Sequence, residues 1–289
     1  MEGLAQDILN GVLLGGLYAI VAIGLSTIFG IVKLVNLAHG DLMILASYMS
    51  LFLMAALGVS PLVTIIAVMP IMFALGYLLQ RFLFNRVLGQ EMEPPLLVAF
   101  GVSIILQNLM LTAFTPDARS LMSDLSIMTF PLGDNLSVPV LYLVDFSIAV
   151  VIILGQHYFL QSTYMGRGIR AASDDQYAAQ LMGVNTKNTY AIAMGIAIMT
   201  AGVAGVLVGM TFTFYPHSGP QYLIISFGVI VIGGLGSMKG TFVGGLILAL
   251  AQILGARIFG PGYQLLCGYV VLLIVLAVRP QGILGRSQS

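Results

Sequence analysis

The chain is a series of long apolar runs separated by short polar connections. A helix needs about 20 mostly apolar residues to cross a membrane, and nine runs reach or approach this length. They lie near residues 8–30, 40–58, 61–80, 95–114, 139–160, 189–210, 221–237, 241–257 and 263–279. The runs are apolar on all sides, whereas strands of a membrane barrel alternate polar and apolar positions. The pattern therefore predicts an all-α polytopic membrane protein with a single transmembrane domain over residues 1–289.

Two places leave the number of spans at eight or nine. Residues 31–40 separate the first two runs. If they are buried, these runs form one broken element, which membranes tolerate only inside protein or beside water. The run 221–237 is short, and residues 211–220 before it are candidates to re-enter the membrane.

Composition agrees with a chain that is dissolved mostly in lipid. Apolar residues make up 59% of the chain and charged residues 8%, against about 25% charged in ordinary soluble domains. The mean hydropathy is +1.03. These values exclude a soluble enzyme, a disordered chain and a basic nucleic-acid binder. The single cysteine, Cys267, excludes a disulfide framework and a CxxC metal site.

The positions of Lys and Arg predict the orientation, because cytoplasmic connections carry an excess of these residues. If the 81–93 connection is cytoplasmic and the spans alternate, Arg119 and Arg257 fall outside. The other nine fall inside: Lys33, Arg81, Arg86, Arg167, Arg170, Lys187, Lys239, Arg279 and Arg286. The N-terminus is then outside and the C-terminus is cytoplasmic.

Two connections are longer than simple turns. Residues 115–138 contain Asp117, Arg119, Asp124 and Asp134, and they are predicted to form an external loop. Residues 161–188 are predicted to form a cytoplasmic loop.

The cytoplasmic loop contains signals for a short helix of its own. Ser173 followed by Gln176 matches a capping box, and Gly183 suits the position just past a helix end. The helix of about nine residues carries one apolar stripe: Tyr177, Ala178, Leu181 and Met182. So short a helix is marginal in water, so we expect the stripe to lie against another protein. The alternative is that it packs on the membrane domain of its own chain.

Polar residues near 36–41 are candidates for a substrate pathway. Asn36, His39, Gly40 and Asp41 lie close together at the start of the second run. Ionisable residues inside a membrane are costly and usually mark a pathway or a partner. The alternative is that Asp41 only caps a helix. Asp145, Gln107 and Asn108 are interpreted as structural hydrogen-bonding groups.

The chain contains no motif for chemistry of its own. The nearest string to a phosphate-binding loop, at 234–241, has its lysine before the glycine. The three histidines lie in different segments, and neither a nucleophile–base pair nor a metal-binding motif is present. We therefore expect no enzyme activity, no cofactor and no metal, and energy must come from a partner or from an ion gradient.

Four strings resemble those of a known family: Gly-Leu-Tyr-Ala-Ile (16–20), Val-Asn-Leu-Ala-His-Gly-Asp (35–41), Gly-Arg-Gly-Ile-Arg-Ala (166–171) and Gly-Gly-Leu-Gly-Ser-Met-Lys-Gly (233–240). They resemble LivHM-type permeases of bacterial ABC importers for branched-chain amino acids, in particular the H-type subunit. The resemblance extends from about residue 6 to residue 284, with order and spacing kept.

The resemblance implies a permease of the bacterial inner membrane that works by alternating access. Its partners would be a second homologous permease, two cytoplasmic ATPases that bind ATP, and a periplasmic substrate-binding protein. It also implies that residues 166–185 correspond to the ATPase-docking loop of the family. The candidate coupling residues are Arg167, Gly168, Arg170, Asp174, Tyr177, Leu181, Met182 and Gly183. Relatives that import urea, amides or aromatic acids, an ion-coupled secondary transporter and a passive channel are the alternatives.

Overall fold

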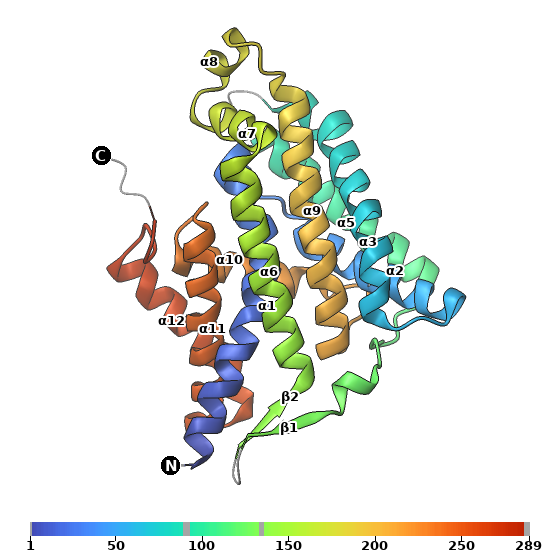
Figure 1. The fold of residues 1–289 in the computed structure, drawn as a ribbon, viewed down its shortest axis with the longest axis vertical. Helices are drawn as coiled ribbons and strands as arrows, with labels where there is room; N and C mark the ends of the chain where they lie inside the picture. Colours follow the sequence, from blue (N-terminus) through green and yellow to red (C-terminus); the bar gives the residue numbers. More distant parts are fainter. Residues whose placement is uncertain (1, 89–92, 133–135, 286–289) are drawn as a thin grey trace.

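The computed structural model describes residues 2–88, 93–132 and 136–285, and most of them are helical. Long helices lie side by side, with the N-terminus at one end of the molecule and the short helices α7 and α8 at the other (Figure 1). We call these the N-terminal end and the coupling end. Asp134 and Arg286, which were assigned from the sequence to the external loop and the cytoplasmic side, lie outside the described residues.

Eight helical segments in this part of the chain are long and apolar enough to cross a membrane, which confirms the predicted fold class. They are α1 (Glu2–Val32), α2 (His39–Leu57), α3 (Pro61–Leu78) with its continuations η1 (Leu79–Phe84) and α4 (Asn85–Val87), α5 (Glu93–Phe114), α6 (Val140–Ser162), α9 (Thr186–Thr211), α11 (Met238–Phe259), and α12 (Gln264–Val278) with the turn η3 (Pro261–Tyr263) before it.

The predicted run 221–237 is the one that does not form a span of full length, because it corresponds to a shorter helix, α10 (Gly219–Gly233). Its 15 residues extend about 22 Å, less than the hydrocarbon core of about 30 Å. The apolar run continues in the sequence, but Gly234 adopts a φ of 109° and ends the helix. The count is therefore eight because α10 is short, and not because the first two spans merge.

The first two spans are separate helices joined by a buried return segment. Lys33 has a φ of 56° and ends α1 at the coupling end, and residues 34–38 are non-helical and mostly buried. They lead back along α1, because the Nε2 atom of His39 lies 2.9 Å from the carbonyl oxygen of Val21. Helix α2 therefore begins inside the protein, where irregular backbone is tolerated.

The arrangement of a long helix, a return segment and a second helix occurs twice, and we call α1 to α5 the first unit and α9 to α12 the second unit. Helix α9 is followed by the non-helical segment 212–218 and then by α10. Helices α1 and α9 are antiparallel, because Gly24 faces Ala197 while Ile31 packs with Tyr190. Each also has an antiparallel neighbour of the other unit: α11 lies along α1, and α3 lies along α9. The two units are thus inverted relative to each other.

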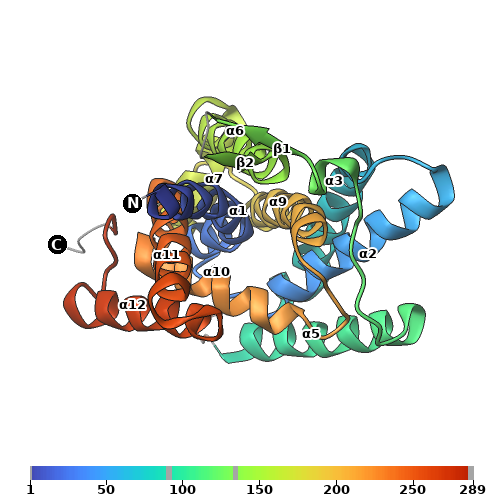
Figure 2. The same cartoon turned by 90° about the horizontal axis from the view of Figure 1, so that it is seen from below.

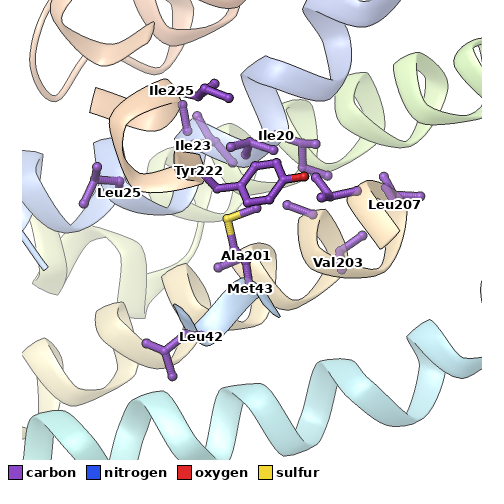
Figure 3. Close-up of a cluster of buried hydrophobic side chains, with 14 of the residues drawn as sticks. Ile20, Ile23, Leu25, Leu42, Met43, Ala201, Val203, Leu207, Tyr222 and Ile225 are labelled. Carbon is purple, nitrogen blue, oxygen red and sulfur yellow. The ribbon is translucent and has the colours of Figure 1, made fainter. Parts of the chain in front are cut away.

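The core lies where α1, α2, α9 and α10 meet. Side chains from all four helices pack together there, among them Ile20, Met43, Val203 and Tyr222 (Figure 3). Helices α1 and α9 are the most buried spans, whereas Gly268 is the single fully buried residue of α12. Small residues allow close crossings: Gly11 and Gly15 lie against Leu250 and Leu246 of α11.

The remaining short elements lie at the two ends. At the N-terminal end, the 115–138 connection carries a turn, η2 (Asp124–Ser126), and a two-stranded antiparallel hairpin, β1 (Thr129–Pro131) and β2 (Ser137–Pro139). At the coupling end lie α7 (Tyr164–Asp174) and α8 (Gln176–Leu181).

Candidate functional site

The first turns of α2 and α10 meet deep inside the helical layer, at a place we call the junction. A Cβ atom on Gly40 would overlap the carbonyl group of Gly219, and a Cβ atom on Gly219 would overlap the carboxyl group of Asp41. Only glycine fits at these two positions without moving a backbone. The junction lies about halfway along α5, whose Ser103 contacts Asp41.

The structure brings the four predicted pathway residues together but buries all of them. Asn36, His39 and Asp41 are each exposed by 2% or less. The side chain of Asn36 accepts a hydrogen bond from the Ala38 N–H at 3.1 Å. The four residues are therefore buried beneath the surface of the chain and are not part of that surface.

Asp41 is not the cap of its helix. The cap position of α2 is Ala38, which makes no side-chain capping bond, and Asp41 lies in the first turn. Its Oδ2 atom instead accepts a hydrogen bond from the Ser103 hydroxyl of α5 at 2.5 Å. The capping alternative was wrong because a partner on a neighbouring helix holds the carboxylate.

A chain of hydrogen bonds leads from Asp41 to the surface. The Gln107 amide donates to Ser103 Oγ at 3.2 Å. The Gln107 Oε1 atom lies 3.2 Å from Nδ1 of His217, an exposed residue in the return segment before α10. The chain thus connects α2, α5 and the return segment, which lie together in the view along the helices (Figure 2).

Sequence reasoning missed Ser103 and His217. Neither belongs to a motif, and the two lie more than 100 positions apart in the chain. The one available signal was that residues 211–220 were candidates to re-enter the membrane, which would place His217 inside the layer.

The other intramembrane polar residues make structural hydrogen bonds, and that of Asp145 joins two helices. Asp145 of α6 is fully buried and accepts a hydrogen bond from the Thr211 hydroxyl of α9 at 2.8 Å. Asn108 of α5 donates to the Ile104 carbonyl of its own helix at 2.8 Å.

At the coupling end, α7 is fastened to the two central helices. Ile169 and Ala172 are buried against Ile31 of α1 and Tyr190 of α9. The Tyr190 hydroxyl donates to the Ala172 carbonyl at 2.9 Å, and the Ser173 hydroxyl donates to the Gly30 carbonyl at 2.8 Å. A displacement of α7 would therefore be passed to the ends of α1 and α9.

The predicted capping box is wrong: the predicted helix corresponds to the shorter α8, and α7 before it was not predicted. Ser173 and Asp174 form the last turn of α7, and Ser173 is already bonded to Gly30. The chain is extended at Asp175, whose carboxylate caps α8 by accepting from the Ala178 N–H at 3.0 Å. The predicted helix end is confirmed, since Gly183 has a φ of 85° just after α8.

The apolar stripe of α8 faces away from the rest of the chain. Tyr177 and Leu181 are each 71% exposed and Met182 is 85% exposed, whereas Ala179 on another face of the helix is buried. Helix α8 thus packs on its own chain through Ala179 and leaves its stripe open.

The two arginines of the loop lie at the C-terminal end of α6. Arg167 donates to the Ser162 carbonyl at 3.1 Å, and Arg170 lies 3.4 Å from the Gln161 carbonyl. Basic side chains in this position satisfy free carbonyls and suit the helix dipole. Gly168, between them, has no crowded neighbour.

Comparison with known proteins gives consistent matches over nearly the whole chain. Residues 7–277 match the family model described as branched-chain amino acid transport system / permease component. The high-affinity branched-chain amino acid transport system permease protein BraD of Pseudomonas aeruginosa is 30% identical, over 98% of this chain and 96% of its own. LivH of Escherichia coli K12, which bears the same description, is 32% identical over the same shares. A probable branched-chain amino acid transport permease protein LivH of Methanocaldococcus jannaschii is 25% identical over 96% and 92%.

Proposed function

Because the chain belongs to the family of branched-chain amino acid transport system permease components, we propose that it carries leucine, isoleucine and valine across the membrane. This proposal is supported by the names of relatives that align over almost their full lengths. Family membership also confirms that the chain is a transport permease, that it is not an enzyme and that it has no cofactor of its own.

The chain is one component of a multi-component transport system, as its relatives are. We propose that the complete importer contains a second homologous permease, two cytoplasmic ATPases and a periplasmic binding protein. The absence of a phosphate-binding loop from the sequence supports separate ATPases.

The distribution of charge supports an orientation with the N-terminus outside and the coupling end in the cytoplasm. Arg119 and Arg257 lie at the N-terminal end, where each is paired with an aspartate, Asp117 and Asp7 respectively. The other basic residues of the described chain belong to the coupling-end connections: Lys33, Arg81, Arg86, Arg167, Arg170, Lys187, Lys239 and Arg279. This asymmetry is the one that membrane insertion imposes on cytoplasmic connections.

Labelling with a membrane-impermeant thiol reagent tests the orientation. Ala118→Cys and Gln176→Cys, each exposed and each in a Cys267→Ser background, mark the two ends. We expect intact cells, with the outer membrane permeabilised, to be labelled at 118 only. Position 176 should react only after the inner membrane is opened. Labelling of both positions from the same side would contradict the orientation.

We assign ATPase docking to residues 161–188, with the α8 stripe as the main contact. An apolar stripe that projects into water is costly unless another protein covers it. Complete burial of one Leu or Met side chain contributes about 1.5–3 kcal/mol, whereas an exposed ion pair contributes about 0–1 kcal/mol. The stripe is therefore expected to contribute more to docking than Arg167 and Arg170.

We place the substrate pathway on the face of the chain formed by α5 and the start of α10. Exposed side chains on this face are mostly apolar, such as Ile104, Ile105 and Ile224, and suit either lipid or a second permease. Polar groups interrupt the face about halfway along α5, at Gln107. Asn36, His39, Gly40 and Asp41 support this surface from behind.

The decisive experiment reconstitutes the chain with its ATPases, second permease and binding protein in proteoliposomes. We expect leucine uptake with ATP present and ion gradients collapsed. Leu181→Asp should abolish capture of the ATPases and uptake together, because the charge enters an apolar contact. Gln176→Asp places the same acid at the start of α8, away from the stripe, and should leave both unchanged.

The alternatives give different results in the same assay. Uptake driven by a gradient without ATP would identify a secondary transporter, and uptake without either would identify a channel. If Leu181→Asp keeps full ATPase capture while its melting temperature is normal, the docking assignment is wrong.

A further inference from the structure

We propose that His217 is the residue of this chain that contacts the α-ammonium group of the passing amino acid, and that Asp41, Ser103 and Gln107 position it. This inference rests on the proposed transport function. It starts from a contrast in exposure: Asp41 is 1% exposed and Ser103 6%, whereas His217 at the other end of the hydrogen-bond chain is exposed.

The chain of hydrogen bonds has one direction. Asp41, as a carboxylate, can only accept, so the Ser103 hydroxyl must donate its proton to it. Ser103 Oγ then accepts from the Gln107 NH₂ group, which leaves the Gln107 carbonyl oxygen to face His217. A carbonyl oxygen only accepts, so Nδ1 of His217 carries the hydrogen.

This direction determines what His217 presents to a ligand. A neutral imidazole with its hydrogen on Nδ1 has a lone pair on Nε2. The Nε2 atom is therefore an acceptor, and a substrate ammonium group is a donor of matching chemistry. The negative charge at the buried end of the chain also favours a cationic group over a carboxylate near His217.

The surroundings of His217 match the rest of a branched-chain amino acid. Ile104 lies three positions before Gln107 on α5, so it is on the neighbouring face of the helix, and it is exposed. It offers an apolar surface to a branched side chain. Asp41 itself cannot be reached, because it is enclosed by Ser103 and by the backbone at Gly219.

The test measures kcat and KM for leucine uptake by the complete importer in proteoliposomes. His217→Phe should lower kcat about 10-fold, the typical effect of losing a hydrogen bond to a charged group, with little change in a KM that the binding protein sets. His217→Gln keeps an acceptor and should retain most of the wild-type rate. Asn108→Ala is the matched control, because Asn108 lies on α5 beside Gln107 but outside the hydrogen-bond chain, and this variant should transport normally.

Double variants test the positioning role. Ser103→Ala and Gln107→Leu should each lower kcat about 3-fold, since one neutral hydrogen bond is lost. Combining Ser103→Ala with His217→Phe should be no worse than His217→Phe alone, because Ser103 acts through His217. Additive losses would overturn the positioning role.

His217→Lys distinguishes the two ends of the amino acid. A fixed positive charge repels an ammonium group, so its uptake should fall below that of His217→Phe. Faster uptake by the lysine variant than by the phenylalanine variant would show that position 217 contacts the substrate carboxylate and would overturn the proposal.

A wild-type uptake rate for His217→Phe would reject the role of His217 without contradicting ATP-driven transport. Failure of the wild-type importer to use ATP would instead reject the proposed function.

Discussion

The junction and the coupling end place polar and apolar side chains in opposite ways. At the junction, polar groups such as Asp41 and Ser103 are buried inside a layer of apolar helices. At the coupling end, Leu181 and Met182 are exposed on a helix that projects beyond the spans (Figure 1). Each arrangement is costly for the isolated chain. Both costly placements lie where we propose that the substrate or a partner protein binds.

The two regions also differ in how they are held together. The junction is a contact between backbones, in which Gly40 and Gly219 leave no room for a side chain. The coupling end is joined to the core by side-chain hydrogen bonds from Ser173 and Tyr190. A defect at the junction should therefore affect folding, whereas a defect at the coupling end should affect the transmission of movement.

The largest effect is expected from Gly40→Ala. The added methyl group overlaps the Gly219 carbonyl, and overpacking of this kind typically costs about 1–3 kcal/mol. We expect the melting temperature in detergent, followed by the loss of monodisperse protein on heating, to fall by several degrees. Gly101→Ala on α5 meets no atom within 4 Å and should be neutral or stabilising, since alanine favours a helix. Equal melting temperatures for the two variants would show that the junction is not tightly packed.

A smaller effect is expected when the fastening of α7 is removed. Ser173→Ala with Tyr190→Phe deletes its hydrogen bonds to Gly30 and Ala172, each worth about 0.5–1.5 kcal/mol. We expect normal ATPase capture but fewer leucine molecules transported for each ATP hydrolysed.

The control removes a tyrosine hydroxyl that bonds to α9 from α3 and not from α7. Tyr77→Phe on α3 removes a hydrogen bond of 2.7 Å to Asn188 of α9 without touching α7. It should keep the normal ratio of transport to hydrolysis. An equal loss of that ratio in both variants would show that α7 has no special part in transmission.

The smallest effect is expected from Arg170→Gln. Its contact with the Gln161 carbonyl is long, at 3.4 Å, and exposed, so capture of the ATPases measured by pull-down should weaken by less than about 5-fold. A loss as complete as that expected for Leu181→Asp would mean that charge, and not the apolar stripe, dominates docking.

The sequence predicted the features that depend on residues close together in the chain. The long apolar runs identified the spans, and Gly183 identified the end of α8. Local patterns failed where a tertiary contact took over. Ser173 was predicted to cap a helix, but its hydroxyl is bonded to Gly30, and Asp175 caps α8.

The candidate site was predictable only in its buried half. The string around His39 and Asp41 is unusual within an apolar run, which was enough to single it out. The partners Ser103 and His217 meet only because residues 212–218 return into the protein beside α5. That return depends on the packing of α10 against α2, for which the sequence contains no local signal.

The inverted arrangement of the two units constrains the number of times that the chain crosses the layer between them. The first unit, α1 to α5, crosses the layer an even number of times and leaves the chain on the side where it began. A second unit can then be upside down only if one further helix intervenes, and α6 is that helix. Within the described residues, α6 and the attached α7 and α8 have no counterpart in either unit, so the segment to which we assign ATPase docking occurs once and on one face. A pseudosymmetric scaffold, which alone would treat both sides of a membrane alike, thereby acquires a direction.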